Sequence, residues 1–349
     1  MKAANLLAPK TLSYQEVPDP DCPKDGLVLQ VHACGICGSD LRTYEGGSSY
    51  AQYPAILGHE ITGEIVESQH PAFPVGQILA VAPVTPCGSC YYCQRGMQNL
   101  CENLKMIGIA AGIQGGFADY LPLTAEILEK GCVEILPKGI DNIPTVLAEP
   151  ASSCLCCQES AGVSLGDKVL IIGAGTLGCL NGTVARLRGA SEVLLAEPSP
   201  DKVQLARSVG FDSIVEEFSS HQAVKDAVME RTAGRGMDVV ITACPSAQAQ
   251  ADALTLARKR GKVIFFGGLP KEALPQINTN IVHYQEVTIY GANAYHPRHF
   301  RMALELVLKN KIEAQKYITK RYPLSRIEDG FNDMKKGIVL KGIFDHSCK

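Results

Sequence analysis

One stretch in the middle of the chain limits the possible folds more than any other. Residues 168–172 (Lys-Val-Leu-Ile-Ile) form an apolar run, as expected for a strand that is buried on both faces of a parallel sheet. The run leads directly into Gly173-Ala174-Gly175-Thr176-Leu177-Gly178 and then into small residues typical of a helix. These glycines permit a tight turn, close approach of the backbone to a pyrophosphate, and close packing of helix on strand. The stretch therefore predicts a Rossmann domain that binds a dinucleotide at the N-terminus of this helix.

The second predicted strand of this domain indicates which dinucleotide is bound. Residues 192–196 are strand-like and end at Glu197, 19 residues after Gly178. An acid at this distance accepts hydrogen bonds from ribose hydroxyls and repels a 2′-phosphate, which favours NAD over NADP. Two basic residues nearby, Lys202 and Arg207, keep NADP as the alternative.

Two further strand-like runs, residues 237–242 and 261–266, complete the pattern of alternating strands and helices. Cys244 and Gly267 follow these runs closely. Since ligands bind at the carboxyl edge of such a sheet, we expect both residues to face the nicotinamide ring.

An earlier region has the composition of a metal site. The segments 37–40 (Cys-Gly-Ser-Asp) and 58–60 (Gly-His-Glu) offer a thiol, an imidazole and a carboxylate, which together suit Zn²⁺. Three protein ligands leave a fourth position open, as in catalytic zinc sites. Ser39 places a hydroxyl beside the thiol, and Asp40 is expected to accept the free N–H of His59. Taken singly, each residue has a plainer interpretation, which is packing near the end of a strand.

Four cysteines then follow at a spacing typical of structural zinc: Cys87, Cys90, Cys93 and Cys101. Four thiolates close a tetrahedral site, and the metal would organise a lobe of about residues 86–102 that has little apolar core of its own. A disulfide cluster is the alternative, but a large chain without a signal peptide argues against it. A DNA-reading finger is disfavoured because Arg95 is the only basic residue between the first and last of these cysteines.

Composition excludes several classes of partner. A chain of 349 residues with 46% hydrophobic and 20% charged residues has room for two globular domains. The formal net charge of −3 provides no basic field for nucleic acid, and no apolar run approaches the roughly 20 residues of a membrane span. The first residues lack the features of a signal peptide, so the fourteen cysteines are expected to be thiols in the cytoplasm. We interpret Cys34 and the helical cysteines (Cys154, Cys156, Cys157 and Cys179) as packing residues.

In this order, the motifs resemble those of the zinc-dependent medium-chain dehydrogenase/reductase family over essentially the whole chain, with the sorbitol (polyol) dehydrogenases as the nearest branch. Residues 149–150 (Glu-Pro) and 337–341 (Gly-Ile-Val-Leu-Lys) add to the resemblance. It implies an α/β protein with a GroES-like, β-rich catalytic domain (residues 1–151 and 293–349). A Rossmann domain with a doubly wound parallel sheet (residues 152–292) would be inserted into it. Relatives are commonly homodimers or homotetramers, and we expect the same here.

The resemblance also implies roles for individual residues. Cys37 and His59 would be ligands of a catalytic zinc, and Glu60 would be the third ligand. Glu149 would bind the metal or hold its water, and the division of work between the two glutamates stays open. Ser39 would pass the alcohol proton away from the metal. With the four-cysteine site, the expected content is two zinc ions per chain.

The activity that the resemblance implies is hydride transfer between NAD and a secondary alcohol, namely a polyol or sugar alcohol that is phosphorylated or not. Arg42 stands where relatives often have a histidine, and it is a candidate to bind an anionic group of the substrate. A surface position or a contact to a cofactor phosphate is the alternative for Arg42. Phe117 would line an apolar wall of the substrate site or fill the core. Other readings are a simple alcohol or L-threonine dehydrogenase, or a zinc- and nucleotide-binding protein without catalysis.

Overall fold

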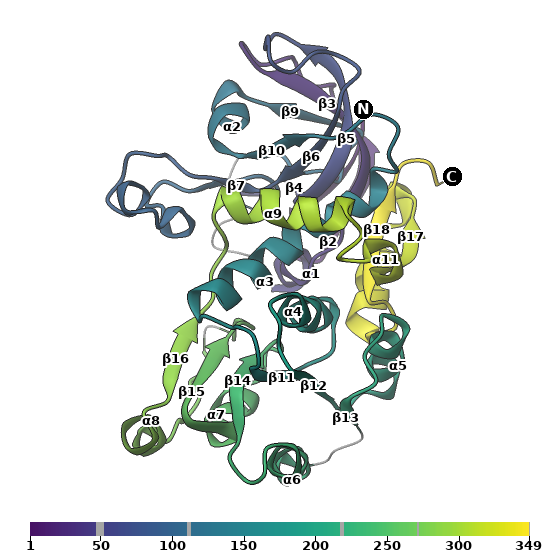
Figure 1. The fold of residues 1–349 in the computed structure, drawn as a ribbon. Helices are drawn as coiled ribbons and strands as arrows, with labels where there is room; N and C mark the ends of the chain where they lie inside the picture. Colours follow the sequence, from purple (N-terminus) through teal and green to yellow (C-terminus); the bar gives the residue numbers. More distant parts are fainter. Residues whose placement is uncertain (47–51, 110–112, 217–219, 271, 349) are drawn as a thin grey trace. The chain divides into compact units, whose positions relative to one another are not determined.

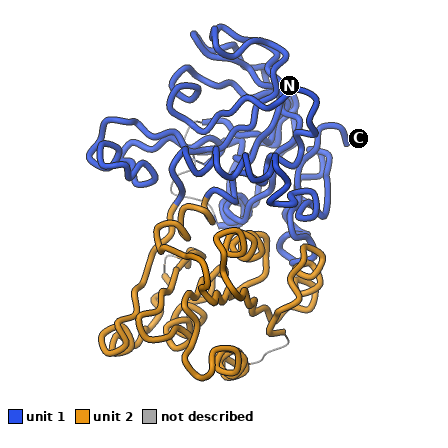
Figure 2. The backbone as a smooth tube through the Cα atoms, viewed as in Figure 1, with its two compact units in different colours: residues 1–152, 294–349 blue, residues 153–293 orange. Residues whose placement is uncertain are grey.

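The structure is a computed structural model that describes residues 1–46, 52–109, 113–216, 220–270 and 272–348 (Figure 1). The chain forms two compact units, which Figure 2 shows in different colours. Residues 1–152 and 294–349 make up the first unit, and residues 153–293 make up the second. Among the described residues, no helix is both long and apolar enough to cross a membrane.

The first unit is built on a seven-stranded sheet in the order β10-β6-β5-β3-β18-β17, with β9 also paired to β3. Its strands are β3 (Leu27–Gly35), β5 (Glu60–Ser68), β6 (Ile78–Ala82), β9 (Tyr120–Leu123), β10 (Cys132–Ile135), β17 (Ile318–Tyr322) and β18 (Lys341–Asp345). Strand β18, from the last part of the chain, pairs antiparallel with β3 from the first part. The site-bearing strand β3 thus has a neighbour from the C-terminal part of the chain that local sequence does not reveal.

Smaller elements complete the first unit. The remaining strands are β1 (Lys2–Ala8), β2 (Thr11–Glu16), β4 (Ala55–Ile56), β7 (Val84–Thr85) and β8 (Lys105–Met106). The helices are α1 (Gly38–Gly46), α2 (Ala125–Lys130), α9 (Pro297–Leu308), α10 (Ala314–Tyr317) and α11 (Ile327–Lys336). One apolar core joins side chains of the sheet, such as Leu29 and Ile61, to Phe331 of α11. This core supports the ends of β3 and β5, where the predicted metal ligands lie.

The second unit is a six-stranded sheet in which every pairing is parallel. Its strands are β11 (Lys168–Ile172), β12 (Glu192–Glu197), β13 (Ile214–Glu216), β14 (Met237–Thr242), β15 (Ala257–Phe265) and β16 (Thr288–Gly291). The order β13-β12-β11-β14-β15-β16 is the 3-2-1-4-5-6 order of a Rossmann domain. Its helices are α3 (Ala148–Ser160, whose first residues belong to the first unit), α4 (Thr176–Leu187), α5 (Pro200–Ser208), α6 (His221–Arg231), α7 (Ala247–Leu256) and α8 (Thr279–Gln285). The predicted fold class is confirmed.

Candidate active site

Pairing of β3 with β5 assembles the predicted metal ligands. The two strands run antiparallel, and Gly35, the last residue of β3, is paired with Glu60, the first residue of β5. Cys37 follows β3 by two residues and His59 directly precedes β5, so the register brings them together from distant parts of the sequence. One ligand atom each from Cys37, His59 and Glu60 all lie within 4.8 Å of one another. A thiol, an imidazole and a carboxylate at this spacing fit a zinc ion.

Asp40 lies against two of these ligands, of which the sequence predicts His59 alone. Its Oδ1 lies 3.3 Å from His59 Nδ1, and its Oδ2 accepts the backbone N–H of Cys37 at 2.9 Å. Burial is the largest single influence and would lower the pKa of His59, but the charges of Asp40 and Cys37 and hydrogen bonds to both residues together raise this pKa well above its usual value. The surroundings of His59 thus favour positive charge, which is the charge that a divalent metal would bring.

Glu60 is held by a residue that sequence reasoning missed. Lys341, the first residue of β18, is buried, and its Nζ donates to Glu60 Oε1 at 2.5 Å and to the carbonyl oxygen of Ile36 at 2.9 Å. A Cβ built on Gly35 would lie 1.8 Å from Glu60 Oε2, so the carboxylate occupies space that only glycine leaves open. The signal for Lys341 in the sequence is its place in residues 337–341, which add to the family resemblance but give the lysine no role.

Glu149, the further predicted zinc-site residue, is hydrogen-bonded to a tyrosine. It lies in the first turn of α3, and Tyr295 donates its hydroxyl hydrogen to Glu149 Oε1 at 2.9 Å. Burial raises the pKa of Glu149 to about 7; the positive charge of His59 opposes this shift and the negative charge of Glu60 adds to it. Among the described residues, the ligand atoms within 4.8 Å of one another here are those of Cys37, His59 and Glu60, without Glu149.

Phe117 has a role in the core and does not form a substrate wall. Its side chain is 1% exposed, and its ring packs edge-on against Phe344 with ring centroids 4.8 Å apart. A Cβ built on Gly58 would lie 2.5 Å from Phe117 Cδ1, so the ring packs directly against the backbone that carries His59. Of the two interpretations of Phe117, the structure supports the core aromatic, because a fully buried ring offers no surface to a ligand.

Ser39 and Arg42 both lie on α1, the helix that begins after Cys37. Ser39 is partly buried in the first turn, and Arg42 is exposed. A Cβ built on Gly38 would lie 3.6 Å from Arg42 Nη1, so the guanidinium folds back toward the start of the helix. A positive charge therefore lies close to the segment that carries Cys37.

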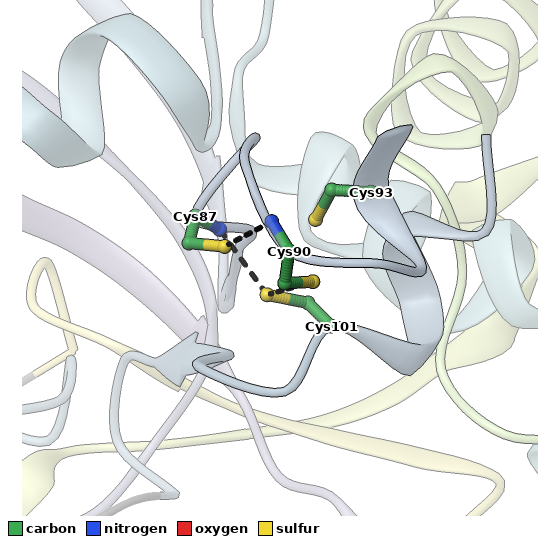
Figure 3. Close-up of side chains that lie close together, drawn as sticks. All are labelled: Cys87, Cys90, Cys93 and Cys101. Carbon is green, nitrogen blue, oxygen red and sulfur yellow. Dashed lines mark hydrogen bonds between the residues drawn. The ribbon is translucent and has the colours of Figure 1, made fainter. Parts of the chain in front are cut away.

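The four predicted cysteines of the lobe converge (Figure 3). Their sulfur atoms all lie within 4.8 Å of one another, and the sulfurs of Cys90 and Cys101 are 3.9 Å apart, well beyond the roughly 2.05 Å of a disulfide. Backbone N–H groups point at the sulfurs: that of Cys87 donates to Cys101 and that of Cys90 donates to Cys87. Backbone hydrogen bonds from Ser89 and Cys90 lower the pKa of Cys87 to about 6. These hydrogen bonds favour the thiolate of Cys87, whereas burial raises the pKa of Cys93 and Cys101, and the four converging sulfurs fit a structural zinc.

In the second unit, the glycine-rich turn has the geometry that the sequence predicts. Gly173 has a φ of 106°, and a Cβ on Gly178 would lie 1.9 Å from the carbonyl oxygen of Gly173, so both positions require glycine. A Cβ on Gly175 would meet no atom of the described residues within 4 Å. Gly175 therefore borders open space just before Thr176 and Leu177 begin α4, as a phosphate-binding turn requires.

Glu197, the last residue of the neighbouring strand β12, is hydrogen-bonded to this turn. It is 5% exposed, its Oε2 accepts the N–H of Ala174 at 2.9 Å, and its Oε1 accepts the N–H of Ser199 at 3.0 Å. Each oxygen keeps a further acceptor position for a ribose hydroxyl. Lys202 lies on the next helix, α5, whereas Arg207 of the same helix is paired with Glu216 at 2.7 Å.

Cys244 and Gly267 follow neighbouring strands of the sheet, β14 and β15. A Cβ on Gly267 would lie 2.5 Å from the carbonyl oxygen of Cys244. The two predicted positions therefore meet at the carboxyl edge of the sheet, close to the glycine-rich turn: a Cβ on Gly173 would lie 3.2 Å from Cys244 Cβ. The cysteines interpreted as packing residues, Cys34 and the four helical ones, are all buried.

Comparison with known proteins agrees with this geometry. Residues 23–135 match the alcohol dehydrogenase GroES-like domain, and residues 176–309 match the zinc-binding dehydrogenase domain. The chain belongs to the zinc-dependent medium-chain dehydrogenase/reductase family. This dehydrogenase is 31% identical to a sorbitol dehydrogenase of Halalkalibacterium halodurans (94% of each chain covered) and 32% identical to an L-threonine 3-dehydrogenase of Pyrococcus horikoshii (94% of each). Among solved structures it resembles a putative zinc-binding dehydrogenase from Sinorhizobium meliloti, bound to NADP, with a TM-score of 0.88, 29% identity and coverage of 99% and 98%.

Proposed function

We propose that this dehydrogenase oxidises a secondary alcohol of a polyol or sugar alcohol, phosphorylated or not, with NAD as the hydride acceptor. The observation that carries the proposal is the set of the partly buried Cys37 and the buried His59 and Glu60, because three such ligands leave a position open for a substrate oxygen. Zinc, when bound there, supplies a Lewis acid that favours loss of the hydroxyl proton near neutral pH.

The protein's own residues then divide the work. Asp40 orients the imidazole of His59, and Lys341 holds the carboxylate of Glu60, which we take as the third ligand since it belongs to the 4.8 Å set. Ser39, two residues after Cys37, is placed to accept the proton that leaves the alcohol. In this proposal, Glu149 is a neighbour of the zinc ligands and does not itself bind the metal.

We propose NAD rather than NADP as the cofactor. The carboxylate of Glu197 is fixed at the turn by two backbone N–H groups, and it would repel a 2′-phosphate on the adjacent ribose. Arg207, which would favour NADP if free, is engaged by Glu216. Cys244 and Gly267 at the sheet edge would lie beside the nicotinamide half of the cofactor.

A second zinc is proposed for the four-cysteine lobe. The purified protein should contain two zinc ions per chain, measured by plasma mass spectrometry. Cys93→Ser should reduce the content to one and lower the melting temperature, whereas Cys22→Ser, outside the lobe, should change neither. If the lobe of Cys93→Ser stayed folded and the protein still contained two zinc ions per chain, this assignment would be contradicted.

For the substrate, we propose that Arg42 binds an anionic group. Its guanidinium lies near the start of α1, close to Cys37 in the chain, and it is exposed and therefore accessible. Arg42→Ala should raise KM about tenfold for a phosphorylated polyol, as expected for one charged hydrogen bond, and less than twofold for the neutral polyol. Arg326→Ala, an exposed arginine on the same unit, is the matched control. Equal effects on both substrates would remove Arg42 from the substrate site.

The decisive experiment measures NADH formation by zinc-loaded protein over polyols, polyol phosphates, simple secondary alcohols and L-threonine. We expect turnover of polyols or their phosphates and loss of turnover in Cys37→Ala. Turnover restricted to simple alcohols or to threonine would replace the proposed substrate class. A protein that holds two zinc ions and binds NAD, yet converts none of these compounds in either direction, would contradict the proposal.

We further propose that the protein is a homo-oligomer. Strand β16 is at the edge of the parallel sheet, and the nearby side chain of Tyr284 on α8 is 76% exposed. An open edge strand next to exposed apolar surface is a common site of self-association. Light scattering coupled to gel filtration should give a mass of at least two chains; a mass of one chain would contradict this.

A further inference from the structure

Gln250 is a buried amide among the apolar residues of α7. It is 6% exposed, and the other buried residues of this helix are Ala253, Leu254 and Leu256. Burying an amide is costly unless the amide is hydrogen-bonded. The Nε2 of Gln250 donates to the carbonyl oxygen of Gly267 at 2.9 Å. This bond joins α7 to the segment that follows β15.

Both backbone groups of Gly267 are engaged by β14 and by the helix that follows it. The N–H of Gly267 donates to the carbonyl oxygen of Thr242, the last residue of β14, at 2.7 Å, and its carbonyl oxygen accepts from Gln250. A Cβ on Gly267 would lie 2.5 Å from the carbonyl oxygen of Cys244, so Gly267 packs directly on the connection between β14 and α7. In these contacts, Gln250 acts through its side chain, whereas Thr242 and Cys244 act through their backbone.

The bond from Gln250 fixes the orientation of a whole peptide group. A trans peptide is planar, so the carbonyl of Gly267 and the N–H of Gly268 point in opposite directions. Because the carbonyl points at Gln250 Nε2, the N–H of Gly268 points away from this side chain. Glycine adopts many backbone conformations, and this peptide joins two glycines, so the local sequence does not fix its orientation. The orientation therefore depends on Gln250.

The place of this peptide in the sheet indicates what it meets. Gly267 lies at the carboxyl edge of the parallel sheet, where ligands of such folds bind. Cys244, on which Gly267 packs, also adjoins the glycine-rich turn, since a Cβ on Gly173 would lie 3.2 Å from Cys244 Cβ. A Cβ on Gly268 would meet no atom of the described residues within 4 Å. The oriented peptide thus borders the proposed dinucleotide site.

We propose that Gln250 is a positioning residue of the cofactor site: by holding the carbonyl of Gly267, it orients the peptide between Gly267 and Gly268, against which the nicotinamide half of NAD docks. The inference rests on the proposed function, because it takes this peptide to lie beside the nicotinamide. The ADP-ribose half of NAD is assigned to the glycine-rich turn and Glu197, which Gln250 does not hold. Gln250 therefore affects one half of the cofactor and leaves the other half unaffected.

The experiment compares the binding of NADH with that of ADP-ribose, which lacks the nicotinamide ring, by titration calorimetry on the zinc-loaded protein. Gln250→Met has a side chain of similar length without the donor. It should weaken NADH binding about tenfold, as expected when a buried carbonyl loses its hydrogen bond, and change ADP-ribose binding by less than about twofold. Unchanged NADH binding, or equal weakening of both ligands, would overturn the inference. If Gln250→Met does not fold, Gln250→Asn, whose amide is too short to reach Gly267, replaces it with the same expectation.

A matched control is available in the same unit. Gln158 is fully buried, and its Nε2 donates to the carbonyl oxygen of Asn181 at 2.8 Å, so Gln158→Met removes a similar buried bond elsewhere. Gln158→Met should lower the melting temperature as Gln250→Met does and leave the affinities for NADH and ADP-ribose within about twofold. If Gln158→Met weakened NADH binding as much as Gln250→Met, the role of Gln250 would be merely structural and the inference would be wrong.

Failure of the proposed function gives a different result in the same titrations. If the unaltered protein bound neither NADH nor ADP-ribose, the proposed cofactor would be wrong, and the role of Gln250 would fall with it. If the unaltered protein bound both ligands and Gln250→Met bound NADH equally well, the proposed cofactor would stand and the inference alone would be refuted. Selective weakening of NADH in Gln250→Met would support both.

Discussion

Lys341 and Glu60 form a buried ion pair between residues 281 positions apart in the sequence. Both side chains are shielded from solvent, and the lysine also donates to the carbonyl oxygen of Ile36. Burying two charges is costly unless they are paired and their remaining hydrogen-bonding groups are used. Because Glu60 is a proposed zinc ligand, this pair joins the last strand of the protein to its metal site.

Lys341→Met should therefore destabilise the protein by about 3–5 kcal/mol, the usual cost of leaving one buried charge without its partner. Unfolding in urea measures this loss. Lys316→Met, which removes the exposed pair with Glu313, should cost less than about 1 kcal/mol. The double variant Lys341→Met/Glu60→Gln should regain part of the stability, because it removes the unpaired charge. If Lys341→Met and Lys316→Met had equal free energies of unfolding, the buried pair would contribute nothing.

Gly35→Ala should release the catalytic zinc selectively. The added Cβ would lie 1.8 Å from Glu60 Oε2, so the carboxylate must move away from its place beside Cys37 and His59. After dialysis, we expect one zinc ion per chain, retained by the four cysteines, and loss of NADH formation. Gly46→Ala, where a Cβ meets none of the described atoms within 4 Å, should keep both metal ions and activity. Retention of both ions in Gly35→Ala would argue against Glu60 as a ligand.

Exchange of Glu197 should change cofactor choice. Glu197→Gln keeps the length of the side chain and removes its charge, so the ratio of kcat/KM for NADP to that for NAD should rise about tenfold, equivalent to about 1.4 kcal/mol of repulsion. Glu192→Gln removes a charge at the opposite end of the same strand, β12, and should leave the ratio unchanged. An unaltered ratio in Glu197→Gln would mean that another residue selects the cofactor.

His346 should contribute to acid sensitivity. Burial lowers its pKa, and the nearby His32 lowers it further, against the opposing charges of Asp119 and Asp345. A lowered pKa in the folded state means that the unfolded chain binds the proton more readily. Stability is therefore present above the ordinary histidine pKa of about 6.5 and is lost as pH falls below it.

The measurement compares free energies of unfolding in urea from pH 7 to pH 5 in the unaltered protein and in His346→Gln. One proton contributes at most about 1.4 kcal/mol per pH unit, so His346→Gln should show a slope shallower by no more than this. The exposed His283→Gln should keep the original slope. A slope that His346→Gln leaves unchanged would assign the acid sensitivity to other groups.

Local patterns in the sequence were sufficient for the architecture. The strand of residues 168–172 and the glycines after it predict the Rossmann unit because a buried strand and a tight phosphate-binding turn are each encoded by adjacent residues. The four-cysteine site can likewise be predicted from sequence, since its ligands lie within fifteen residues, 87–101. Cys37, His59 and Glu60 were identified by residue type and by resemblance, and the register of β3 with β5 brings them together.

Tertiary structure alone decided which residues surround these ligands. Phe117 is suited by sequence to a substrate wall or to the core, and only the packing of Phe344 against it settles its place. No local sequence pattern indicates the roles of Lys341, Gly35 and Tyr295. These roles depend on partners that strand register or the return of the chain at Ala294 brings close. Residue types and short spacings thus determined the fold and the chemistry of the ligands, whereas burial and long-range pairing determined how those ligands are held. The physical reason is that the cost of a buried charge or hydroxyl is set by its neighbours in space, which short-range periodicity does not encode.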